Sequence, residues 1–532
     1  MNISKLFLGS TTTLLEHYKA QNERTTDYIS NYLLITEKYK MELTILRKAQ
    51  ILAIAMARND RLFTEYLLRN TDLPTILKTC QILDSGRLAR QMDRKTTQIT
   101  NKKRLASHKS IISNLKSLNE GLELSLTGAK IKNIIKWCIK SLNAAELELL
   151  ALQLPKSQWK KLANLLHTKD TDYPLDWFNS YIFDKPIHDT TSVAQFAALK
   201  DTDPTEHASQ LLNLVKTFQP SYAWLKSSFK KSITPELLHV IAQYEKPEQL
   251  LHHWETFESE HDLIVQRFKK EAYELSYGTL MRHLLYLDPE LGISKLLADH
   301  AQQCLANYSY LTVDQPVLVL ADASASMDVA IRVSTIISSV LCSLFTAELR
   351  LFRNDDQLID PPPRSVTDVL RLGRELRAGR STAPSASLKP LLDEKRIVKT
   401  IIIVTDEEEN TDYNGEWSRD PTRLFAGVYK EYHDTVYPAR LIFVSFLSSP
   451  GDGQMVRALK EIMPEAPITQ FWMDRYKPDL RKLDSILNQM TITTLQFEND
   501  VAEMKKQDFT TLFKSTENKP DTMDEKQNCN IS

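Results

Sequence analysis

The most constraining feature of the sequence is an apolar run that ends in an acidic, hydroxyl-rich loop. Residues 316–321 read Pro-Val-Leu-Val-Leu-Ala, and Asp322-Ala323-Ser324-Ala325-Ser326-Met327 follows directly. A short, continuous apolar run of this kind is typical of a buried strand in a parallel sheet. The loop after such a strand lies at the carboxyl edge of the sheet, where open α/β folds bind ligands. One carboxylate and two hydroxyls are hard oxygen ligands that suit Mg²⁺, so we predict a metal-dependent binding site.

The sequence after residue 312 alternates short apolar runs with helical patterns. The predicted strands are 317–321, 348–352, 400–405, 440–446 and 468–472. The predicted helices are 330–345, 366–376, 422–432, 454–462 and 478–489. Strand and helix alternation predicts an α/β, doubly wound (Rossmann-like) domain with a largely parallel sheet over residues 313–495.

Two further segments of this domain supply oxygen ligands. The apolar run 401–404 leads through Thr405 to Asp406, which we expect at the same edge as Asp322, and Gly379-Arg380-Ser381-Thr382 offers another hydroxyl. The predicted ligands of Mg²⁺, or of another divalent cation, are Asp322, Ser324, Ser326, Thr382 and Asp406, with waters completing an octahedron. The alternative is that these oxygens only cap helices and hold no metal.

The three segments together resemble a von Willebrand factor A domain with a metal-ion-dependent adhesion site (MIDAS). The resemblance implies that a protein partner supplies a carboxylate to the ion. Two departures from the family pattern stand out. In the loop 379–382, where the family has Gly-Gly-Thr, Ser381 could replace Thr382 as the ligand and Arg380 would bring a positive charge near the ion. The run Glu407-Glu408-Glu409 after Asp406 could raise the affinity for divalent ions or supply an internal ligand.

The sequence before residue 312 has apolar residues at three- and four-residue spacings almost throughout. The predicted helices include 42–56, 71–83, 129–142, 144–152, 157–167, 208–218, 235–244, 264–273 and 278–287. This density predicts an all-α module over 1–312, of the HEAT-like helical-repeat kind. No repeat of fixed period is found, so an irregular bundle is the alternative. Residues 496–532 are polar and charge-mixed, which predicts a disordered tail.

The charge is uneven along the chain, although its net value is only −1. Residues 1–150 hold 24 Lys and Arg against 14 Asp and Glu, and no Phe, Trp or Tyr occurs between Gln81 and Glu120. The candidate RNA-binding cations are Arg87, Arg90, Arg94, Lys95, Lys102, Lys103, Arg104, Lys109 and Lys116, with a helical row at Lys132, Lys136 and Lys140. Cations without aromatic residues suit phosphate contacts, and an ordinary solvated surface is the alternative.

The order of the two modules is similar to that of the Ro autoantigen, or TROVE-domain, family. The segment 322–327 resembles that family's Asp-Val-Ser-x-Ser-Met, and Leu280-Met281-Arg282-His283-Leu284-Leu285 resembles a helix that precedes its A domain. The resemblance implies a ring of HEAT-like repeats that binds small structured RNA and misfolded RNA ends, in a ribonucleoprotein. The alternative is a Mg²⁺-dependent adaptor, such as an A-domain partner of an AAA+ ATPase, without RNA binding.

Motifs for catalysis and for membrane insertion are not found in the sequence. No nucleotide-binding, zinc-protease or nucleophile-elbow pattern lies in a suitable context, so we predict a binding protein and not an enzyme; a metal nuclease is the remaining catalytic alternative. The five cysteines are scattered without a CxxC pair, and the N-terminus is too weak for a signal peptide. We therefore expect a cytoplasmic protein with reduced thiols and no membrane partner.

Overall fold

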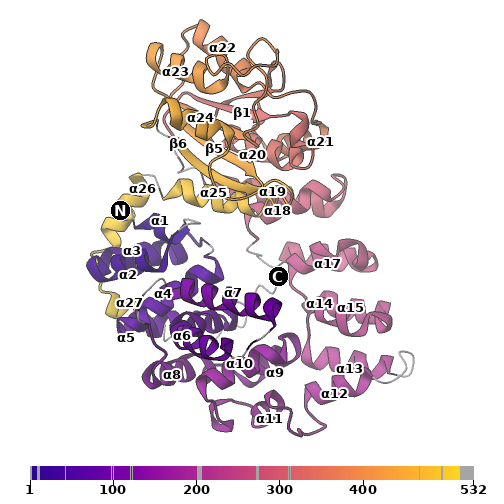
Figure 1. Cartoon of the computed structure of the whole chain (residues 1–532). Coiled ribbons are helices and arrows are strands. Elements are labelled where there is room, and N and C mark those ends of the chain that lie inside the picture. Colours follow the sequence, from indigo (N-terminus) through magenta and orange to yellow (C-terminus); the bar gives the residue numbers. More distant parts are fainter. Residues whose placement is uncertain are drawn as a thin grey trace. The chain divides into compact units, whose positions relative to one another are not determined.

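The computed structural model divides the chain into two compact units (Figure 1). Unit 1 comprises Met1–Gln266 and Glu498–Ser532, and unit 2 comprises Arg267–Phe497. The residues described are 3–8, 12–41, 43–97, 99, 101–119, 122, 124–200, 207–270, 275–308, 311, 313–466, 468–492 and 495–515. The division falls at Gln266 and not at residue 312, because helices α18 (Tyr277–Tyr286) and α19 (Gly292–Ala306) pack against helices of unit 2.

Every regular element that the structure describes in unit 1 is helical, which confirms the all-α prediction for this part of the chain. Its α-helices up to Gln266 are α1 (Ser4–Leu8), α2 (Leu14–Glu23), α3 (Thr25–Leu33), α4 (Ile45–Ala57), α5 (Arg61–Arg69), α6 (Leu73–Thr96), α7 (Lys102–Asn119), α8 (Gly128–Ile134), α9 (Ala144–Gln153), α10 (Lys156–Leu166), α11 (Phe178–Ile182), α12 (Ser192–Lys200), α13 (Ala208–Phe218), α14 (Tyr222–Phe229), α15 (Pro235–Tyr244), α16 (Pro247–His252) and the start of α17 (His261–Lys270). Short π- and 3₁₀-helical turns lie between them: η1 (Leu34–Lys38), η2 (Ile135–Ile139), η3 (Asp170–Asp172), η4 (Lys230–Ser232) and η5 (Trp254–Glu260).

Side-chain caps explain where several of these helices begin. Asn143 accepts a hydrogen bond from the backbone N–H of Glu146 at 2.7 Å, and the Glu146 carboxylate accepts one from the backbone N–H of Asn143 at 3.0 Å. This capping box satisfies two N–H groups that α9 would otherwise leave unpaired. Asp72 caps α6 in a simpler way, since its carboxylate accepts from the N–H of Thr75 at 2.7 Å.

The helices of unit 1 pack in two patterns along the chain. The apolar helix α4 contacts α2, α5 and α6, so the first helices form a group around it. From α9 onward the contacts run from α9 to α12, from α12 to α13, from α13 to α15 and from α15 to η5 (Figure 1). Contacts between successive helices are the arrangement typical of a helical repeat.

A buried polar network lies at the start of unit 1. Arg47 donates from Nη1 to Nε2 of His17 at 2.8 Å, and His17 Nδ1 lies 2.5 Å from the hydroxyl of Tyr28. His17 and Tyr28 are both 0% exposed. Because Nε2 accepts from an arginine, Nδ1 carries the proton and donates to Tyr28. Burial, together with the positive charge of Arg47, lowers the pKa of His17 to about 3.

This network predicts that unit 1 loses stability in mild acid. The pKa of His17 is about 3 in the folded state, against 6.5 as its ordinary value, so the unfolded chain binds an additional proton between these values. The His17 contribution is therefore complete above about pH 6.5 and falls by roughly 1.4 kcal/mol per pH unit below it. We expect the stability lost between pH 7 and pH 5 to be smaller in His17→Gln than in the wild type. Urea unfolding followed by tryptophan fluorescence measures this, because Trp137, Trp159, Trp177, Trp224 and Trp254 lie in unit 1. An equal loss in both proteins would contradict the assignment, and substitution of the exposed His252 is the control.

The C-terminal segment forms two helices, which belong to unit 1 from Glu498 onward, where the sequence predicts a disordered tail. These are α26 (Leu495–Met504) and α27 (Phe509–Ser515). Asp500 accepts hydrogen bonds from Lys38 Nζ and the Tyr39 hydroxyl, both at 2.5 Å, and the Phe513 ring lies 4.8 Å from that of Tyr66. The prediction is wrong for 496–515 because a polar sequence needs few apolar contacts when its acids meet cations of another segment. Residues 516–532 of the predicted tail lie outside the described residues.

These contacts predict that the stability of unit 1 depends on helix α27. The Phe513 side chain is 7% exposed and its ring stacks on Phe63, with 6.0 Å between ring centroids. Truncation of a buried Phe to Ala costs about 3 kcal/mol or more, so Phe513→Ala should lower the free energy of unfolding of unit 1 by about that amount. Urea unfolding followed by tryptophan fluorescence measures the change. Lys506→Ala is the matched control, because this side chain is 70% exposed and pairs with its helical neighbour Glu503. An unchanged midpoint in Phe513→Ala would show that α27 contributes nothing to unit 1.

Unit 2 is built on a six-stranded sheet with the order β3-β2-β1-β4-β5-β6. Its strands are β1 (Val317–Asp322), β2 (Glu348–Phe352), β3 (Asp356–Leu358), β4 (Thr400–Thr405), β5 (Arg440–Leu447) and β6 (Ile468–Asp474), and its helices after α18 and α19 are α20 (Ile331–Leu344), α21 (Val366–Glu375), α22 (Pro384–Asp393), α23 (Phe425–Thr435), α24 (Gln454–Ile462) and α25 (Lys482–Thr491). All neighbouring strands are parallel except the edge strand β3, which is antiparallel to β2. The predicted doubly wound α/β domain is confirmed.

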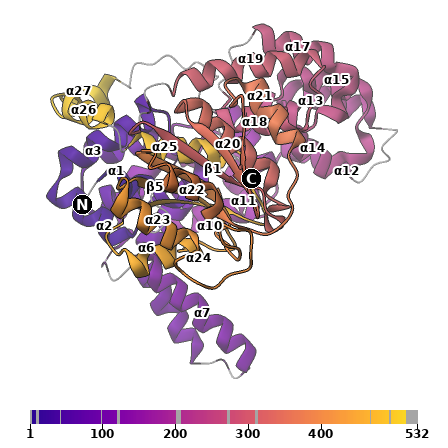
Figure 2. The ribbon, with the colours of Figure 1, turned by 90° about the horizontal axis from the view of Figure 1, so that it is seen from above.

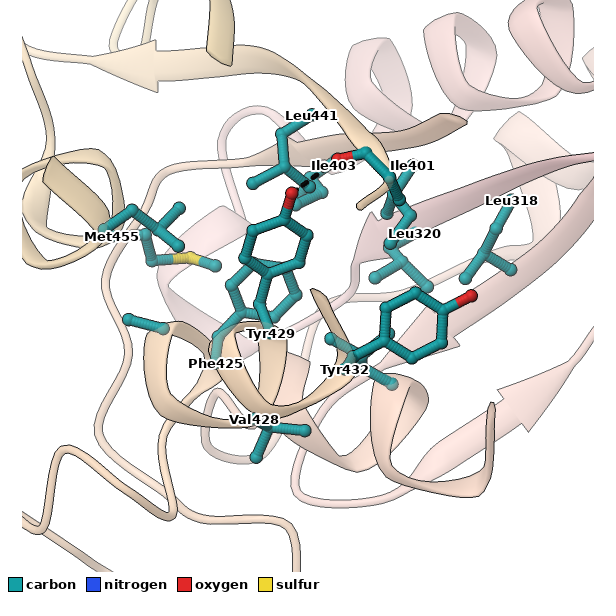
Figure 3. Packing of buried hydrophobic residues seen from close by; sticks show 14 of the residues in the cluster. Leu318, Leu320, Ile401, Ile403, Phe425, Val428, Tyr429, Tyr432, Leu441 and Met455 are labelled. Carbon is teal, nitrogen blue, oxygen red and sulfur yellow. Dashed lines mark hydrogen bonds between the residues drawn. The ribbon is translucent and has the colours of Figure 1, made fainter. Parts of the chain in front are cut away.

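The core of unit 2 holds the central strands in place. Every residue of β1 and of β4 is buried, as expected for strands covered on both faces. On one face, side chains such as Leu320 and Ile403 pack against α22, α23 and α24 (Figure 3). The Tyr429 hydroxyl donates to the carbonyl of Ala439, which ties α23 to the start of β5 (Figure 3). Helix α20, with α21 beside it, packs on β1, β2 and β4. This core fixes the carboxyl ends of β1 and β4 side by side.

Two general expectations can be compared with the described residues. No helix among them is long and apolar enough to cross a membrane. Cys80, Cys138 and Cys342 are buried and Cys304 is partly buried, each as a free thiol, while Cys529 lies outside the described residues.

Candidate metal and nucleic-acid sites

The predicted metal ligands of the first loop gather at the carboxyl end of β1. Asp322 is the last residue of β1 and is 1% exposed. One of its carboxylate oxygens accepts from the N–H of Ser324 at 2.9 Å, and the other accepts from the hydroxyl of Thr405 at 2.6 Å. The hydroxyls of Ser324 and Ser326 lie 3.0 Å apart. One carboxylate and two hydroxyls therefore meet in one loop, as the sequence predicts.

Asp406 joins this group from the end of β4. The register pairs Ala321 with Val404, so Asp322 lies beside Thr405 and one residue from Asp406. Asp406 Oδ1 accepts from the N–H of Glu408 at 3.1 Å, and the Ser326 side chain is among the groups that act on the pKa of Asp406. Asp406 Oδ2 is buried, and no residue in the described part of the chain donates a hydrogen bond to it. The structure thus brings Asp322, Ser324, Ser326 and Asp406 together.

Arg475, after β6, was not predicted from the sequence and lies beside these ligands. Its Nη2 is 3.3 Å from Asp406 Oδ2 and donates to the carbonyl of Ser326 at 3.2 Å, while its Nη1 donates to Glu408 at 2.5 Å. Its side chain is 21% exposed. No local pattern marks an arginine that reaches a loop about 150 residues away in the sequence, so only the fold reveals it.

The loop 379–382 lies alongside the first loop. The N–H of Ala325 donates to the carbonyl of Arg380 at 3.0 Å, and the N–H of Gly379 donates to the carbonyl of Ala323 at 3.0 Å. Thr382 is 2% exposed, and its N–H donates to the side chain of Asn410 at 3.2 Å. The guanidinium of Arg380 pairs with Asp355 at 2.6 Å, so its charge is directed to that acid. Whether Thr382 or Ser381 is the ligand stays a prediction.

The acids after Asp406 have separate structural partners. The Glu407 carboxylate accepts from the Ser445 hydroxyl at 2.5 Å, from Gln470 at 2.6 Å and from the N–H of Val456 in the first turn of α24 at 3.0 Å. A Cβ at Gly453 would lie 2.3 Å from this carboxylate, so glycine is required there. Glu409 accepts from the N–H of Phe425 at 2.7 Å, at the start of α23. Both carboxylates cap helices, so neither Glu407 nor Glu409 is a candidate internal metal ligand.

Burial sets the electrostatics of the site. It raises the pKa of Asp322, and the neighbouring negative charge of Asp406 raises it further. Burial also raises the pKa of Asp406. Two buried carboxylates in proximity disfavour the doubly ionised state unless a positive charge joins them. A divalent cation would provide that charge.

The residues present fit a hard divalent cation. The described residues contain no group of three or more His, Cys, Asp and Glu side chains that would hold a metal. The donors at the end of β1 are instead two carboxylates and two hydroxyls, with Thr382 on the adjoining loop. An all-oxygen set with few charges suits Mg²⁺ that keeps several waters. A cation bound here would compete with Arg475, whose Nη2 lies 3.3 Å from the buried Oδ2 of Asp406.

The predicted RNA-binding cations lie mostly on one helical pair of unit 1. Helices α6 and α7 pack along each other and form a hairpin that projects from the other helices of unit 1 (Figure 2). In α7 only Ile112 is buried, and the partly buried Leu105, His108 and Leu115 lie at helical spacing with it. We call residues 87–116 the cationic hairpin.

The cationic hairpin has nine Lys and Arg residues and one acid, Asp93. Arg87 pairs with Asp84 at 2.5 Å. Within the described part of the chain, no carboxylate lies within salt-bridge distance of the other cations, which are exposed: Arg90, Arg94, Lys95, Lys102, Lys103, Arg104, Lys109 and Lys116. Eight cations therefore face solvent without an acidic partner from the described residues.

The second predicted row lies apart from the hairpin in the sequence, on α8 and η2, which packs against α5. Lys132 is exposed. Lys136 lies 3.9 Å from the centroid of the Trp137 ring, and Lys140 lies 3.4 Å from Asp172. Two of the three lysines thus have partners within unit 1, and the row is a weaker candidate for phosphate contacts than the hairpin.

The comparisons with known proteins find similarity only among solved structures. No family model and no curated protein matches the sequence. The crystal structure of the Ro (RSR) protein of Deinococcus radiodurans is similar, with 12% sequence identity and a TM-score of 0.47 over 82% of this chain and 92% of that chain. A von Willebrand factor type A protein from Catenulispora acidiphila is similar over 34% of this chain and 42% of that chain, with 16% identity and a TM-score of 0.24.

Proposed function

We propose that this chain is a non-catalytic RNA-binding protein of the Ro type, in which unit 1 binds structured or misfolded RNA and unit 2 binds a divalent cation and a protein ligand. The observation that carries the RNA part is the cationic hairpin, with nine cations against one acid on a projecting pair of helices. Phosphate contacts from such a surface recognise shape and charge, and they carry no base-specific information.

The salt dependence of binding tests the RNA part. Each phosphate neutralised contributes about −0.7 to −0.9 to the slope of log K against log salt concentration. If about five of the hairpin cations contact phosphates, the slope should be roughly −4. Filter binding of a structured RNA to the full chain between 50 and 200 mM salt, with constant Mg²⁺, measures it. A slope near zero, or no binding at low salt, overturns this part of the proposal.

The cation part is supported by the buried carboxylates of Asp322 and Asp406 beside the hydroxyls of Ser324 and Ser326. These residues would hold Mg²⁺ and orient it toward the open edge of the sheet. A bound cation would supply a coordination position that accepts a carboxylate from a partner. Isothermal titration with Mg²⁺ or Mn²⁺ tests this part directly, since the cation alone is the probe.

The same measurements separate the alternatives. An adaptor without RNA binding keeps the cation site in unit 2 and shows no salt-dependent RNA binding. A metal nuclease cleaves RNA, and the cleavage is lost in Asp322→Asn. The proposed binding protein leaves the RNA intact under conditions in which it binds.

A further inference from the structure

We infer that Arg475 is a tethered positive charge that stands in for the divalent cation at Asp406 and moves to Glu408 when the cation binds. The inference rests on the proposed cation site and deepens it, because it specifies how occupancy of that site is controlled. It also gives a role to the middle acid of the run 407–409. Glu407 and Glu409 cap helices, whereas Glu408 accepts from Arg475.

The side chain of Arg475 lies between two acids in different surroundings. Its Nη2 is 3.3 Å from Asp406 Oδ2, and its Nη1 donates to Glu408 at 2.5 Å. The Asp406 side chain is 0% exposed, whereas that of Glu408 is 55% exposed. A positive charge beside a buried carboxylate stabilises its ionised form. Arg475 therefore does at Asp406 part of what a divalent cation would do.

Charge repulsion makes joint occupancy of the site unfavourable. Asp322 and Asp406 carry two negative charges when both are ionised, and one divalent cation balances them. A guanidinium that stayed beside Asp406 would add an unbalanced positive charge next to the cation. Both carboxylates are buried, at 1% and 2% exposure, so water screens this repulsion weakly. Binding of the cation and contact of Arg475 with Asp406 therefore oppose each other.

The backbone around Arg475 is held independently of its side chain. Asp474, the last residue of β6, accepts from the N–H groups of Tyr476 and Lys477 at 2.9 and 3.0 Å. These bonds fix the turn that follows β6. Release of Asp406 thus requires only a rotation of the long side chain of Arg475. Glu408 is already in contact with that side chain and offers it a partner at the surface.

Two substitutions of Arg475 test the competition. Arg475→Gln should bind Mn²⁺ about tenfold more tightly than the wild type, because the coupling between close charges is at least of that order. Arg475→Lys should lie between the two, since it keeps the charge but not the fork that holds the Ser326 carbonyl and Glu408 at once. Titration calorimetry of the full chain measures the three affinities. An arginine that only braced the loop at Ser326 would leave Mn²⁺ affinity unchanged or weaker when removed, and that outcome overturns the inference.

Arg380→Gln is the matched control for the loss of charge. The carbonyl of Arg380 accepts from the N–H of Ala325, so this residue also adjoins the first loop, but its guanidinium pairs with Asp355 at 2.6 Å. The substitution should change Mn²⁺ affinity by less than about twofold at about 150 mM salt, because exposed charges are screened. A gain equal to that of Arg475→Gln would show that only the net charge of unit 2 matters, which overturns the inference.

Glu408→Gln tests the second position of the guanidinium. In the wild type this change should weaken Mn²⁺ binding several-fold, because Arg475 loses its alternative partner and stays at Asp406. In the Arg475→Gln background it should have a much smaller effect, because only the screened charge of Glu408 is then lost. Equal effects in the two backgrounds would show that Glu408 acts on the cation independently of Arg475, and the inferred movement would be wrong.

Chemical modification follows the side chain of Arg475 directly. Phenylglyoxal reacts with accessible guanidinium groups, and mass spectrometry of the modified full chain gives the rate at each arginine. Arg475, which is 21% exposed, should react several-fold faster in Mg²⁺ than in EDTA, whereas Arg371, which is 63% exposed, should react equally in both. Equal reactivity of Arg475 in both conditions, with Mn²⁺ binding intact, overturns the inference alone. Absence of Mn²⁺ binding in the wild type and in Arg475→Gln alike overturns the proposed cation site itself.

Discussion

Asp322→Asn is expected to abolish cation binding in unit 2 without unfolding it. Asp322 supplies one of two carboxylates in a set whose other members are neutral hydroxyls. Changes to residues that only support a metal ligand cost about 10- to 100-fold in metal affinity, so loss of a ligand charge should cost at least about 100-fold. Calorimetric titration with Mn²⁺ measures the affinity of both proteins.

Thermal unfolding provides a second readout for Asp322→Asn. A cation at 100 times its dissociation constant should stabilise the folded wild type by about 2.7 kcal/mol, and the variant should gain nothing. In EDTA the variant should be at least as stable as the wild type, because burial and the charge of Asp406 already raise the pKa of Asp322 and disfavour its ionised form.

Glu409→Gln is the matched control for Asp322→Asn. Glu409 is a buried acid that follows β4, the strand that leads to Asp406. Burial raises its pKa to about 8, and its carboxylate accepts from the start of α23. Glu409→Gln should leave Mn²⁺ affinity unchanged. If Asp322→Asn binds Mn²⁺ as tightly as the wild type, or if Glu409→Gln loses binding equally, Asp322 is not a ligand of the cation.

The central strands and the first metal loop could be predicted from the sequence because their signals are local. Strands β2 and β4 begin and end where they were predicted. β4 is buried throughout and has an uninterrupted apolar centre, whereas β2 alternates the partly buried Glu348 and Arg350 with buried apolar residues. Asp406 lies near Asp322 because β1 and β4 are parallel neighbours, and the carboxyl ends of parallel strands lie at the same edge of the sheet. Helix α22 was missed because Pro384 and Pro390 interrupt its pattern, although Pro384 is tolerated in its first turn.

The roles of the acids after Asp406 could not be predicted, because their partners are distant in the sequence. Glu407 has a positive φ of 62°, which a run of identical residues does not indicate. Its carboxylate meets Ser445, Val456 and Gln470, which come from three later elements. Similarly, the polar residues after 495 are typical of a disordered segment, and their order depends on hydrogen bonds from Lys38 and Tyr39 to Asp500. Local composition carries no information about such tertiary contacts.

Charge reversal of Lys102, Lys103 and Arg104 is expected to remove most RNA binding. These cations lie in the first turn of α7, at the outer end of the cationic hairpin, and all are exposed. The triple Glu variant should lower RNA affinity by at least about 100-fold at 100 mM salt and make the slope of log K against log salt less steep by about 2. Filter binding over a salt series measures both quantities.

The triple variant should keep the hairpin folded, which makes a loss of binding interpretable. Acidic residues in the first turn of a helix interact favourably with its dipole, so Glu at these positions stabilises α7. The side chain of Asn101 also caps this turn, since it accepts from the N–H of Lys103 at 3.0 Å and of Arg104 at 3.1 Å. Circular dichroism of the variant should therefore match that of the wild type.

A second triple variant distinguishes the position of the charge from its amount. Lys226, Lys230 and Lys231 are exposed on α14 and η4 of unit 1, and their replacement by Glu changes the net charge by the same six units. If the cationic hairpin is the RNA surface, this control should bind RNA nearly as the wild type does. Equal weakening in both variants would mean that only the net charge of unit 1 matters, and unchanged binding in the hairpin variant would place the RNA surface elsewhere.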